Sequence, residues 1–385
     1  MPHALPTLDE MLDRLIAHPS VSSVDASLDT GNRAVSECLA NWLETIGFRV
    51  RLDQVQGHTD KCNVIGVLGE GSAELVLAGH TDTVPFDEDR WTGDPFVPRR
   101  EQGRLYGLGA TDMKSFFALV LEALRNLPPG KLRRPLVVLA TADEESGMAG
   151  ARQLVEAGEP LGRFALIGEP TGLRPVRAHK GILMMRIILV GRSGHSSDPA
   201  LGRSALEGMH EVMHGLIALR SQLAATSSDQ RFAVPAPTLN FGRIAGGDNP
   251  NRICARCELD VDLRLTPGIR LAQARNLLME TVHTAIAGRG LEVRFRSLFD
   301  GVEAMDTPAD SALVSACEAI TGHRAGMVSF ATEAPFLDQL GMQTVVMGPG
   351  DIDVAHQPDE FLELARIEPM LGYLRQLIHD CCEAG

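Results

Sequence analysis

Short apolar runs alternate with helical segments at both ends of the chain, but the pattern changes in the middle. Strands are predicted at residues 63–68, 74–78, 136–140 and 164–167, and the clearest helix between them spans 114–127. Strands that are apolar throughout are typical of a parallel sheet covered by helices on both faces. Apolar strands alternating with helices are predicted again after residue 306. The two ends are therefore predicted to form one α/β domain with a mostly parallel sheet flanked by helices.

The middle of the chain follows another order: strand, helix, two strands, helix, strand. These segments predict a compact α+β domain inserted into the α/β domain. A length of 385 residues suits two domains better than one. We place the α/β domain at residues 1–179 and 301–385, and the inserted domain at 180–300.

Composition limits the partners. The chain has 36 basic and 50 acidic residues, which give a formal charge of −14. Such a chain is repelled by nucleic acid and by anionic lipid, so neither is expected as a partner. The N-terminal sequence has no signal-peptide pattern, and no apolar run is long enough to span a bilayer. Seven cysteines, an odd number spread over a long chain, favour reduced thiols and a cytoplasmic location.

Polar motifs follow the predicted strands, and all lie in the α/β domain. They occupy residues 78–85, 107–114, 140–150, 167–171 and 354–361. In open α/β sheets, ligands bind at the C-terminal ends of strands. Histidines and carboxylates gathered there predict a metal site, and their number suggests two ions that share a bridging carboxylate. The side chains concerned are His80, Asp82, Asp112, Asp143, Glu144, Glu145, Glu169 and His356.

Each of these residues also has an ordinary explanation when it is taken alone. His80 can be a loop histidine, Asp112 can cap a helix, and residues 143–145 can form a solvated acidic turn. Their joint placement after successive strands favours the metal site.

Several stretches resemble one superfamily. They include GHTDTVP (79–85), TDMK (111–114), DEESG (143–147), GEP (168–170) and HQPDEF (356–361). In order and spacing the chain resembles the co-catalytic metallopeptidases and deacylases, which include aminoacylases and succinyl-diaminopimelate desuccinylase. Within that superfamily it is most similar to the acetylornithine deacetylases. The resemblance implies a catalytic α/β domain and an inserted lid or dimerisation domain, so a homodimer is expected.

The resemblance also implies a role for each motif residue. It assigns His80 and Glu169 to one ion, Glu145 and His356 to the other, and Asp112 to both. Glu144 becomes the general base, and Asp82 becomes the residue that orients the His80 ring. The ligand types suit two divalent ions, with zinc or cobalt expected.

For the reaction, the resemblance implies hydrolysis of a small N-acyl amino acid, N-acetyl-L-ornithine, as a step of arginine biosynthesis. His195 is either an ordinary loop histidine or a donor that reaches the active site; the resemblance favours the donor and implies that the second subunit of a dimer supplies it. Lys180, Asn251 and Arg264 are expected to bind the substrate carboxylate. Glu333 is expected to bind the ornithine ammonium, with a surface or helix-terminal acid as the alternative.

Three other hypotheses remain open at this point. N-acetylcitrulline or N-succinyl-diaminopimelate can replace N-acetylornithine as substrate. A catalytically silent binding protein can share the fold, although the complete ligand set argues against it. The segment His210–His214 matches the zinc-binding pattern H-E-x-x-H, but Ile217 and Arg220 break its usual extension.

Overall fold

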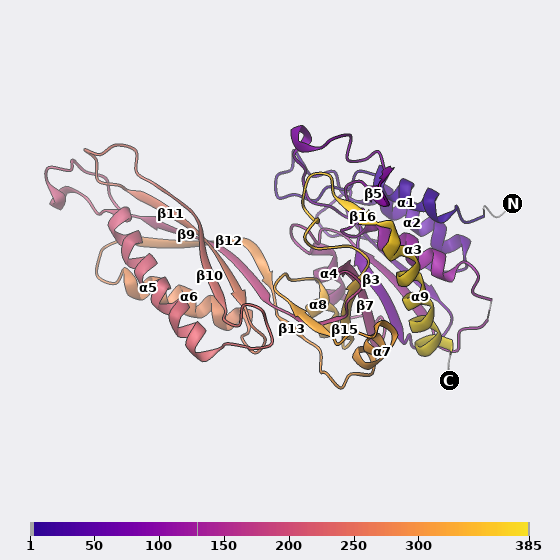
Figure 1. Cartoon of the computed structure of the whole chain (residues 1–385). Helices are drawn as coiled ribbons and strands as arrows, with labels where there is room; N and C mark the ends of the chain where they lie inside the picture. Colours follow the sequence, from indigo (N-terminus) through magenta and orange to yellow (C-terminus); the bar gives the residue numbers. More distant parts are fainter. Residues whose placement is uncertain (1–3, 129, 384–385) are drawn as a thin grey trace. The chain divides into compact units, whose positions relative to one another are not determined.

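The computed structural model describes residues 4–128 and 130–383 (Figure 1). The chain divides into two compact units. Unit 1 runs to Arg177 and resumes at Thr307–Gly326 and from Thr332 onward, and unit 2 consists of Ala178–Asp306 and Met327–Ala331. The domain boundaries predicted from the sequence (1–179, 180–300 and 301–385) stay predictions. Their outermost residues, 1–3 and 384–385, lie outside the described part.

A large sheet forms the centre of unit 1. Counted from one edge, its first six strands run in the order β1-β2-β6-β3-β7-β15. The four strands from β6 to β15 are parallel to one another, whereas β1 pairs with β2, and β2 with β6, in antiparallel fashion. The bounds are β1 Arg49–Gln54, β2 Cys62–Leu68, β3 Leu75–His80, β6 Leu136–Thr141, β7 Phe164–Pro170 and β15 Gln343–Gly348. The mostly parallel sheet predicted from the apolar runs is present, and the antiparallel pairs at both of its edges are an addition to that prediction.

Helices cover both faces of this sheet. On one face α1, α2, α3, α7 and α9 pack together and supply most of the larger apolar core. On the other face α4 contacts α8 (Figure 1). The bounds are α1 Leu8–Ala17, α2 Arg33–Thr45, α3 Lys114–Leu124, α4 Ala149–Ala157, α7 Ala312–Thr321, α8 Ala334–Gln339 and α9 Ile367–Ile378. Nearly every residue of α3 is buried, because neighbouring helices and the sheet enclose it.

A small second sheet completes unit 1. It joins β4 (Arg99–Glu101), β5 (Arg104–Tyr106) and β16 (Phe361–Glu363) in the order β16-β5-β4. This sheet places the chain that follows β5 beside the chain that precedes β16. Two of the polar motifs, around Asp112 and His356, lie in those segments.

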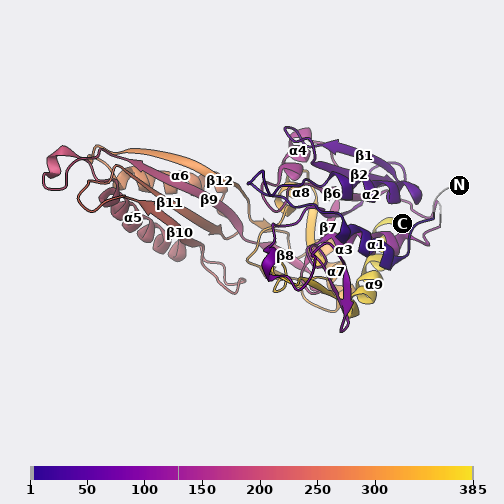
Figure 2. The same cartoon turned by 90° about the horizontal axis from the view of Figure 1, so that it is seen from above.

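Unit 2 is a four-stranded antiparallel sheet with two helices on one face (Figures 1 and 2). The strand order is β10-β11-β9-β12. The bounds are β9 Gly181–Val190, α5 Ala205–Thr226, β10 Thr238–Gly246, β11 Arg256–Leu265, α6 Leu271–Ala285 and β12 Glu292–Val302. Alternate residues of β11 are buried, as expected for a sheet with one covered face. The order of elements is the one predicted.

Three short strands continue the large sheet beyond β15: β8 (Val176–His179) pairs with β15, and β13 (Met305–Asp306) and β14 (Gly326–Val328) pair with β8. Within the described part of the chain, no helix combines the length and the apolar character needed to cross a membrane.

Candidate active site

The motif residues come together at one edge of the unit 1 sheet. His80 is the last residue of β3, Glu169 lies near the end of β7, and Glu144 follows the end of β6. Because β6, β3 and β7 are parallel neighbours, their C-terminal ends meet at the same edge. Asp112 lies just before α3, and His356 lies in the loop between β15 and β16.

Two glycines allow α3 to pack tightly beneath this edge. Gly79 precedes His80, and a side chain at Gly79 would overlap Met113 at the start of α3. Gly168 precedes Glu169, and a side chain there would overlap the ring of Phe116. The ends of β3 and β7 therefore pack against Met113 and Phe116. This packing fixes the positions of the two candidate ligands that follow the glycines, His80 and Glu169.

Asp112 lies between the two histidines. Its Oδ1 is 3.1 Å from Nε2 of His80, and its Oδ2 is 3.3 Å from Nε2 of His356. Glu145 Oε1 is 3.1 Å from the same His356 nitrogen. Each oxygen of Asp112 thus faces a different histidine, which is the arrangement that a carboxylate shared by two ions needs.

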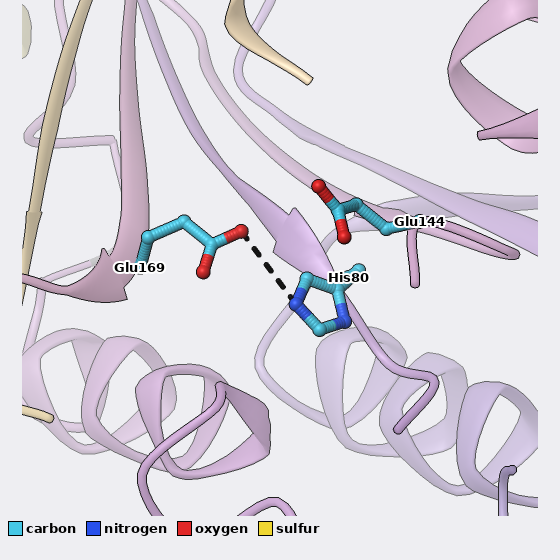
Figure 3. Close-up of side chains that lie close together, drawn as sticks. All are labelled: His80, Glu144 and Glu169. Atoms are coloured by element: carbon cyan, nitrogen blue, oxygen red, sulfur yellow. Dashed lines mark ion pairs between the residues drawn. The ribbon is translucent and has the colours of Figure 1, made fainter. Parts of the chain in front are cut away.

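Glu169 and Glu144 complete the group on the His80 side. Glu169 Oε1 is 3.6 Å from His80 Nε2, and the carboxyl groups of Glu144 and Glu169 both lie near the His80 ring (Figure 3). Possible ligand atoms of His80, Glu144 and Glu169 lie within 4.8 Å of one another, and so do those of His80, Asp112 and Glu145. Glu144 therefore lies as close as a ligand would, and its assignment as the base stays a prediction.

Burial makes this group electrostatically costly. Burial raises the pKa of the Glu144 carboxyl well above its usual range, and the charges of Glu145 and Asp82 add to that rise. Burial and the charge of Asp112 likewise raise the pKa of Glu169 well above its usual range. Hydrogen bonds to Asp112 and Glu145 raise the pKa of His356 to about 11. Acids that resist ionisation and a histidine that holds its proton indicate a site short of positive charge.

Asp82 holds the turn that carries Glu144 and Glu145. Its Oδ2 accepts a hydrogen bond of 3.1 Å from the Glu145 amide, and its Oδ1 has no hydrogen-bond partner among the described residues. The nearest acceptor to His80 Nδ1 is the Asp82 main-chain oxygen at 2.9 Å, whereas the Asp82 carboxylate is 3.6 Å away. Asp82 thus contacts the His80 ring through its backbone.

The residues of this site fit divalent metal ions. Two imidazoles and several carboxylates offer the nitrogen and oxygen atoms that zinc, cobalt and manganese bind. Most of the acids are buried, and Asp82 Oδ1, which has no hydrogen-bond partner among the described residues, lies beside them. Cations would offset this excess of buried negative charge.

Glu360 is a member of the site that sequence reasoning missed. It lies within the motif HQPDEF and is 1% exposed. Its carboxylate accepts hydrogen bonds from the main-chain amides of Gly109, Thr111 and Asp112, at 3.2, 2.7 and 3.0 Å. It thereby ties the loop of Asp112 to the segment that follows His356. The sequence feature that could have identified Glu360 is its position in the same motif as His356.

Glu333 is completely buried at the N-terminus of α8. Thr141, the last residue of β6, donates a 2.6 Å hydrogen bond to its Oε2, while its Oε1 has no partner among the described residues. Burial raises the pKa of Glu333 to about 7. Glu333 is therefore not a surface acid, and its role as the ligand of the ornithine ammonium stays a prediction.

The predicted substrate-binding residues of unit 2 fall into two groups. Lys180 is buried at the start of β9, where its Nζ donates to the Ala236 carbonyl at 2.7 Å, and Arg264 lies on the neighbouring strand opposite Ile182. His195 and Asn251 lie in adjoining loops past the other end of β9. Since β9 has ten residues, about 30 Å separates the two groups.

The segment 210–214 is part of α5. The side chain of His210 is 81% exposed, and His214 is also exposed. Met209, Val212 and Leu216 form the buried stripe of this helix. Among the described residues, the groups that could hold a metal ion lie in unit 1 and include neither histidine.

Histidines and carboxylates gathered at the C-terminal edge of an open α/β sheet define the class of metal-dependent hydrolases. The model of peptidase family M20/M25/M40 matches residues 76–380. The chain belongs to this family.

Curated relatives match nearly the whole chain. An acetylornithine deacetylase from Proteus mirabilis is 47% identical over 380 residues, which cover 99% of this chain and 98% of the relative. An acetylornithine deacetylase from Yersinia pestis is 44% identical over 384 residues, with 98% of each chain covered.

Solved structures share the fold. The M20 family metallo-carboxypeptidase Sso-CP2 from Sulfolobus solfataricus aligns with a TM-score of 0.77 at 18% identity, and the alignment covers 97% of this chain and 98% of that one. The YXEP protein of Bacillus subtilis, described as a dinuclear metal binding peptidase from the M20 family, aligns with a TM-score of 0.67 at 15% identity over 97% and 98% of the two chains.

Proposed function

We propose that this chain hydrolyses N-acetyl-L-ornithine to L-ornithine and acetate in arginine biosynthesis, in the cytoplasm. The observation that carries the proposal is the arrangement of Asp112 between His80 and His356, beside Glu144, in a chain that resembles acetylornithine deacetylases along its length. The seven cysteines are free thiols, which suits a reducing compartment.

Two divalent ions, zinc or cobalt, would be held by five residues. His80 and Glu169 would bind one ion, Glu145 and His356 the other, and Asp112 both. When bound, such ions polarise an amide carbonyl and lower the pKa of water. The distances between these side chains support this division.

In the reaction, water adds to the acetyl carbon and the carbon–nitrogen bond breaks. The Glu144 carboxylate accepts a proton from the attacking water and then donates a proton to the departing amine. Its buried position beside His80 and Glu169 supports this role. Asp82 keeps Glu145 and the His80 ring in place through its carboxylate and its main-chain oxygen.

The chain would act as a homodimer. A substrate of amino-acid size cannot contact both Lys180 and Asn251 of one chain, because about 30 Å of strand lies between them. Two chains can supply one group each. Leu206 and Ile217 on α5 and Ile244 on β10 are 43%, 42% and 52% exposed, and apolar side chains exposed on unit 2 suit contact with a second copy.

Mixing two inactive variants tests the dimer. If His195 serves the neighbouring chain's site, His195→Ala mixed with Glu144→Gln regains part of the activity, because one site of each hybrid is intact. Light scattering should give twice the chain mass. A monomer, or no regain after verified exchange of subunits, contradicts this part of the proposal.

For the substrate, Lys180 and Arg264 provide positive charge for the carboxylate, and Glu333 would accept the ornithine ammonium. The unpaired Glu333 Oε1 supports this role. Glu333→Gln should weaken turnover of N-acetylornithine far more than that of N-acetylmethionine, whose side chain is uncharged. An equal loss on both substrates would indicate a structural role.

A substrate panel tests the activity itself. Acetate or succinate release is measured from N-acetylornithine, N-acetylcitrulline, N-acetylmethionine and N-succinyl-diaminopimelate, with zinc or cobalt supplied. We expect the highest kcat/KM on N-acetylornithine. A higher value on N-acetylcitrulline or the succinyl substrate would overturn the substrate assignment, and no turnover on any of them would favour a silent binding protein.

A further inference from the structure

A buried lysine lies behind the turn that carries Glu144 and Glu145. Lys61 precedes β2 and is 4% exposed. Its Nζ forms an ion pair with the Asp143 carboxylate, a second one of 2.7 Å with Asp29, and a 3.3 Å contact with the Ser22 hydroxyl. The reaction described above makes no use of this lysine.

Asp143 organises the turn through its own acceptor atoms. Its Oδ1 accepts from the hydroxyls of Ser22 and Ser146 at 2.7 and 2.9 Å, and its Oδ2 accepts from the Ala149 amide at 3.3 Å. Its main-chain oxygen accepts from the Gly147 amide at 3.0 Å. One residue therefore holds both ends of the segment between β6 and α4.

The backbone of this turn needs such support. Asp143 has a φ of 68° and Met148 a φ of 54°, in the left-handed region that non-glycine residues rarely adopt. Conformations of this kind persist only where surrounding contacts enforce them. Glu144 and Glu145 lie between these two residues, so their directions depend on the turn.

Asn63 binds the same turn from the same strand. Its Oδ1 accepts from the Ala142 amide at 3.1 Å, and its Nδ2 donates to the Gly150 carbonyl at 3.0 Å. Residues 61 and 63 are two positions apart, a spacing that places side chains on one side of a strand. Asn63 thus binds the two ends of the turn, at Ala142 and Gly150, and Lys61 binds Asp143 inside it.

We propose that Lys61 is a positioning residue, which through its buried ion pair with Asp143 fixes the turn that carries Glu144 and Glu145. The proposal rests on the function proposed above, in which Glu144 moves the proton. Lys61 contacts neither substrate nor ion in this account. Its effect reaches the reaction only through the direction of the two glutamates.

The first test is Lys61→Met, which keeps the length of the side chain and removes its charge. Steady-state kinetics are measured on metal-loaded protein whose ion content has been determined. Displacing a catalytic group by about 1 Å typically costs up to ~100-fold, so we expect kcat to fall by roughly 10- to 100-fold and KM to change by less than about threefold. Lys61→Arg, which restores the cation, should recover most of the loss.

A second readout is independent of turnover. Hydrogen exchange followed by mass spectrometry reports on the peptide that contains residues 142–150. In Lys61→Met the amides of this peptide should exchange faster than in the wild type, while peptides of β3 and β7 should be unchanged. The matched control is Lys131→Met, which removes an ion pair of 2.5 Å between the half-exposed Lys131 and Glu383. It should alter neither kcat nor exchange of the turn.

The variant Asp143→Asn keeps the test decisive if Lys61→Met folds poorly. If the two residues act as a pair, Lys61→Met should add little to the loss of kcat in the Asp143→Asn background. An unchanged kcat and unchanged exchange in Lys61→Met overturn the proposal. So does a loss of kcat that is equally large in the Asp143→Asn background. A wrong substrate assignment would appear as poor turnover by the wild type, whereas the exchange comparison would stand.

Discussion

Glu144→Gln should make the protein more stable and almost inactive at the same time. Glu144 is 9% exposed, and one of its carboxyl oxygens lies within 4.8 Å of a Glu169 oxygen. At an effective dielectric constant near 20, two carboxylates at that distance repel by about 3 kcal/mol when both are ionised. Glutamine keeps the shape and removes the charge. General base catalysis is worth roughly a hundred- to ten-thousand-fold, so turnover should fall by that factor.

The pH dependence of this gain has a definite sign. Burial raises the pKa of Glu144 in the folded chain above its value of 4.5 in the unfolded chain. Below pH 4.5 the carboxyl is protonated in both states, so the variant and the wild type should be equally stable. Above it the wild type loses stability as the pH rises, because the folded state resists ionisation. The variant should therefore gain most at alkaline pH.

Thermal unfolding of the metal-free protein at pH 4 and pH 8.5 measures this difference. A gain of about 3 kcal/mol corresponds to an increase in Tm of roughly 6 to 12 °C at pH 8.5. Glu363→Gln, at a partly exposed ion pair with Arg104, is the control and should change neither Tm nor turnover appreciably. A Glu144→Gln protein that is less stable at pH 8.5, or that keeps wild-type turnover, would refute the reasoning.

Three further predictions concern the rest of unit 1. Asp112→Ala should reduce the bound metal at both sites and abolish turnover, since each of its oxygens faces a different histidine; full metal content, measured by mass spectrometry, would contradict this. Gly168→Ala should destabilise the fold by about 1–3 kcal/mol in a denaturant titration, because its methyl group overlaps Phe116. Burial raises the pKa of Asp338 to about 6 from 3.8, so stability is lost as the pH rises through that range; Asp338→Asn should raise Tm at pH 8 and leave it unchanged at pH 3.5.

Local patterns were enough to predict much of this molecule. The strands β3, β6 and β7 are buried throughout and begin with apolar residues, and each leads into a motif. Because parallel neighbours end at one edge, the meeting of His80, Glu144 and Glu169 follows from the order of segments alone. The order of strands and helices in the inserted unit could be predicted equally well, because apolar and polar residues alternate along its strands. The short strands β4, β5 and β16 have three residues each, too few to show a period.

The contacts that support the site were not predictable in the same way. Lys61 and Asp143 are 82 positions apart, and Asp112 and Glu360 are 248 apart. No spacing rule links such residues, because the fold alone brings them together. Glu333 illustrates the same limit, since the sequence allowed a surface acid and tertiary packing buried it completely.

The most direct test of the central claim is a metal titration of the chelated protein with N-acetyl-L-ornithine as substrate. Zinc or cobalt is added back in steps, while acetate release and the number of ions bound per chain are measured on the same samples. We predict no turnover without metal, and a rate that rises as ions bind and levels off at up to two per chain. Full turnover by the metal-free protein, or no acetate release from the fully loaded one, would contradict the account.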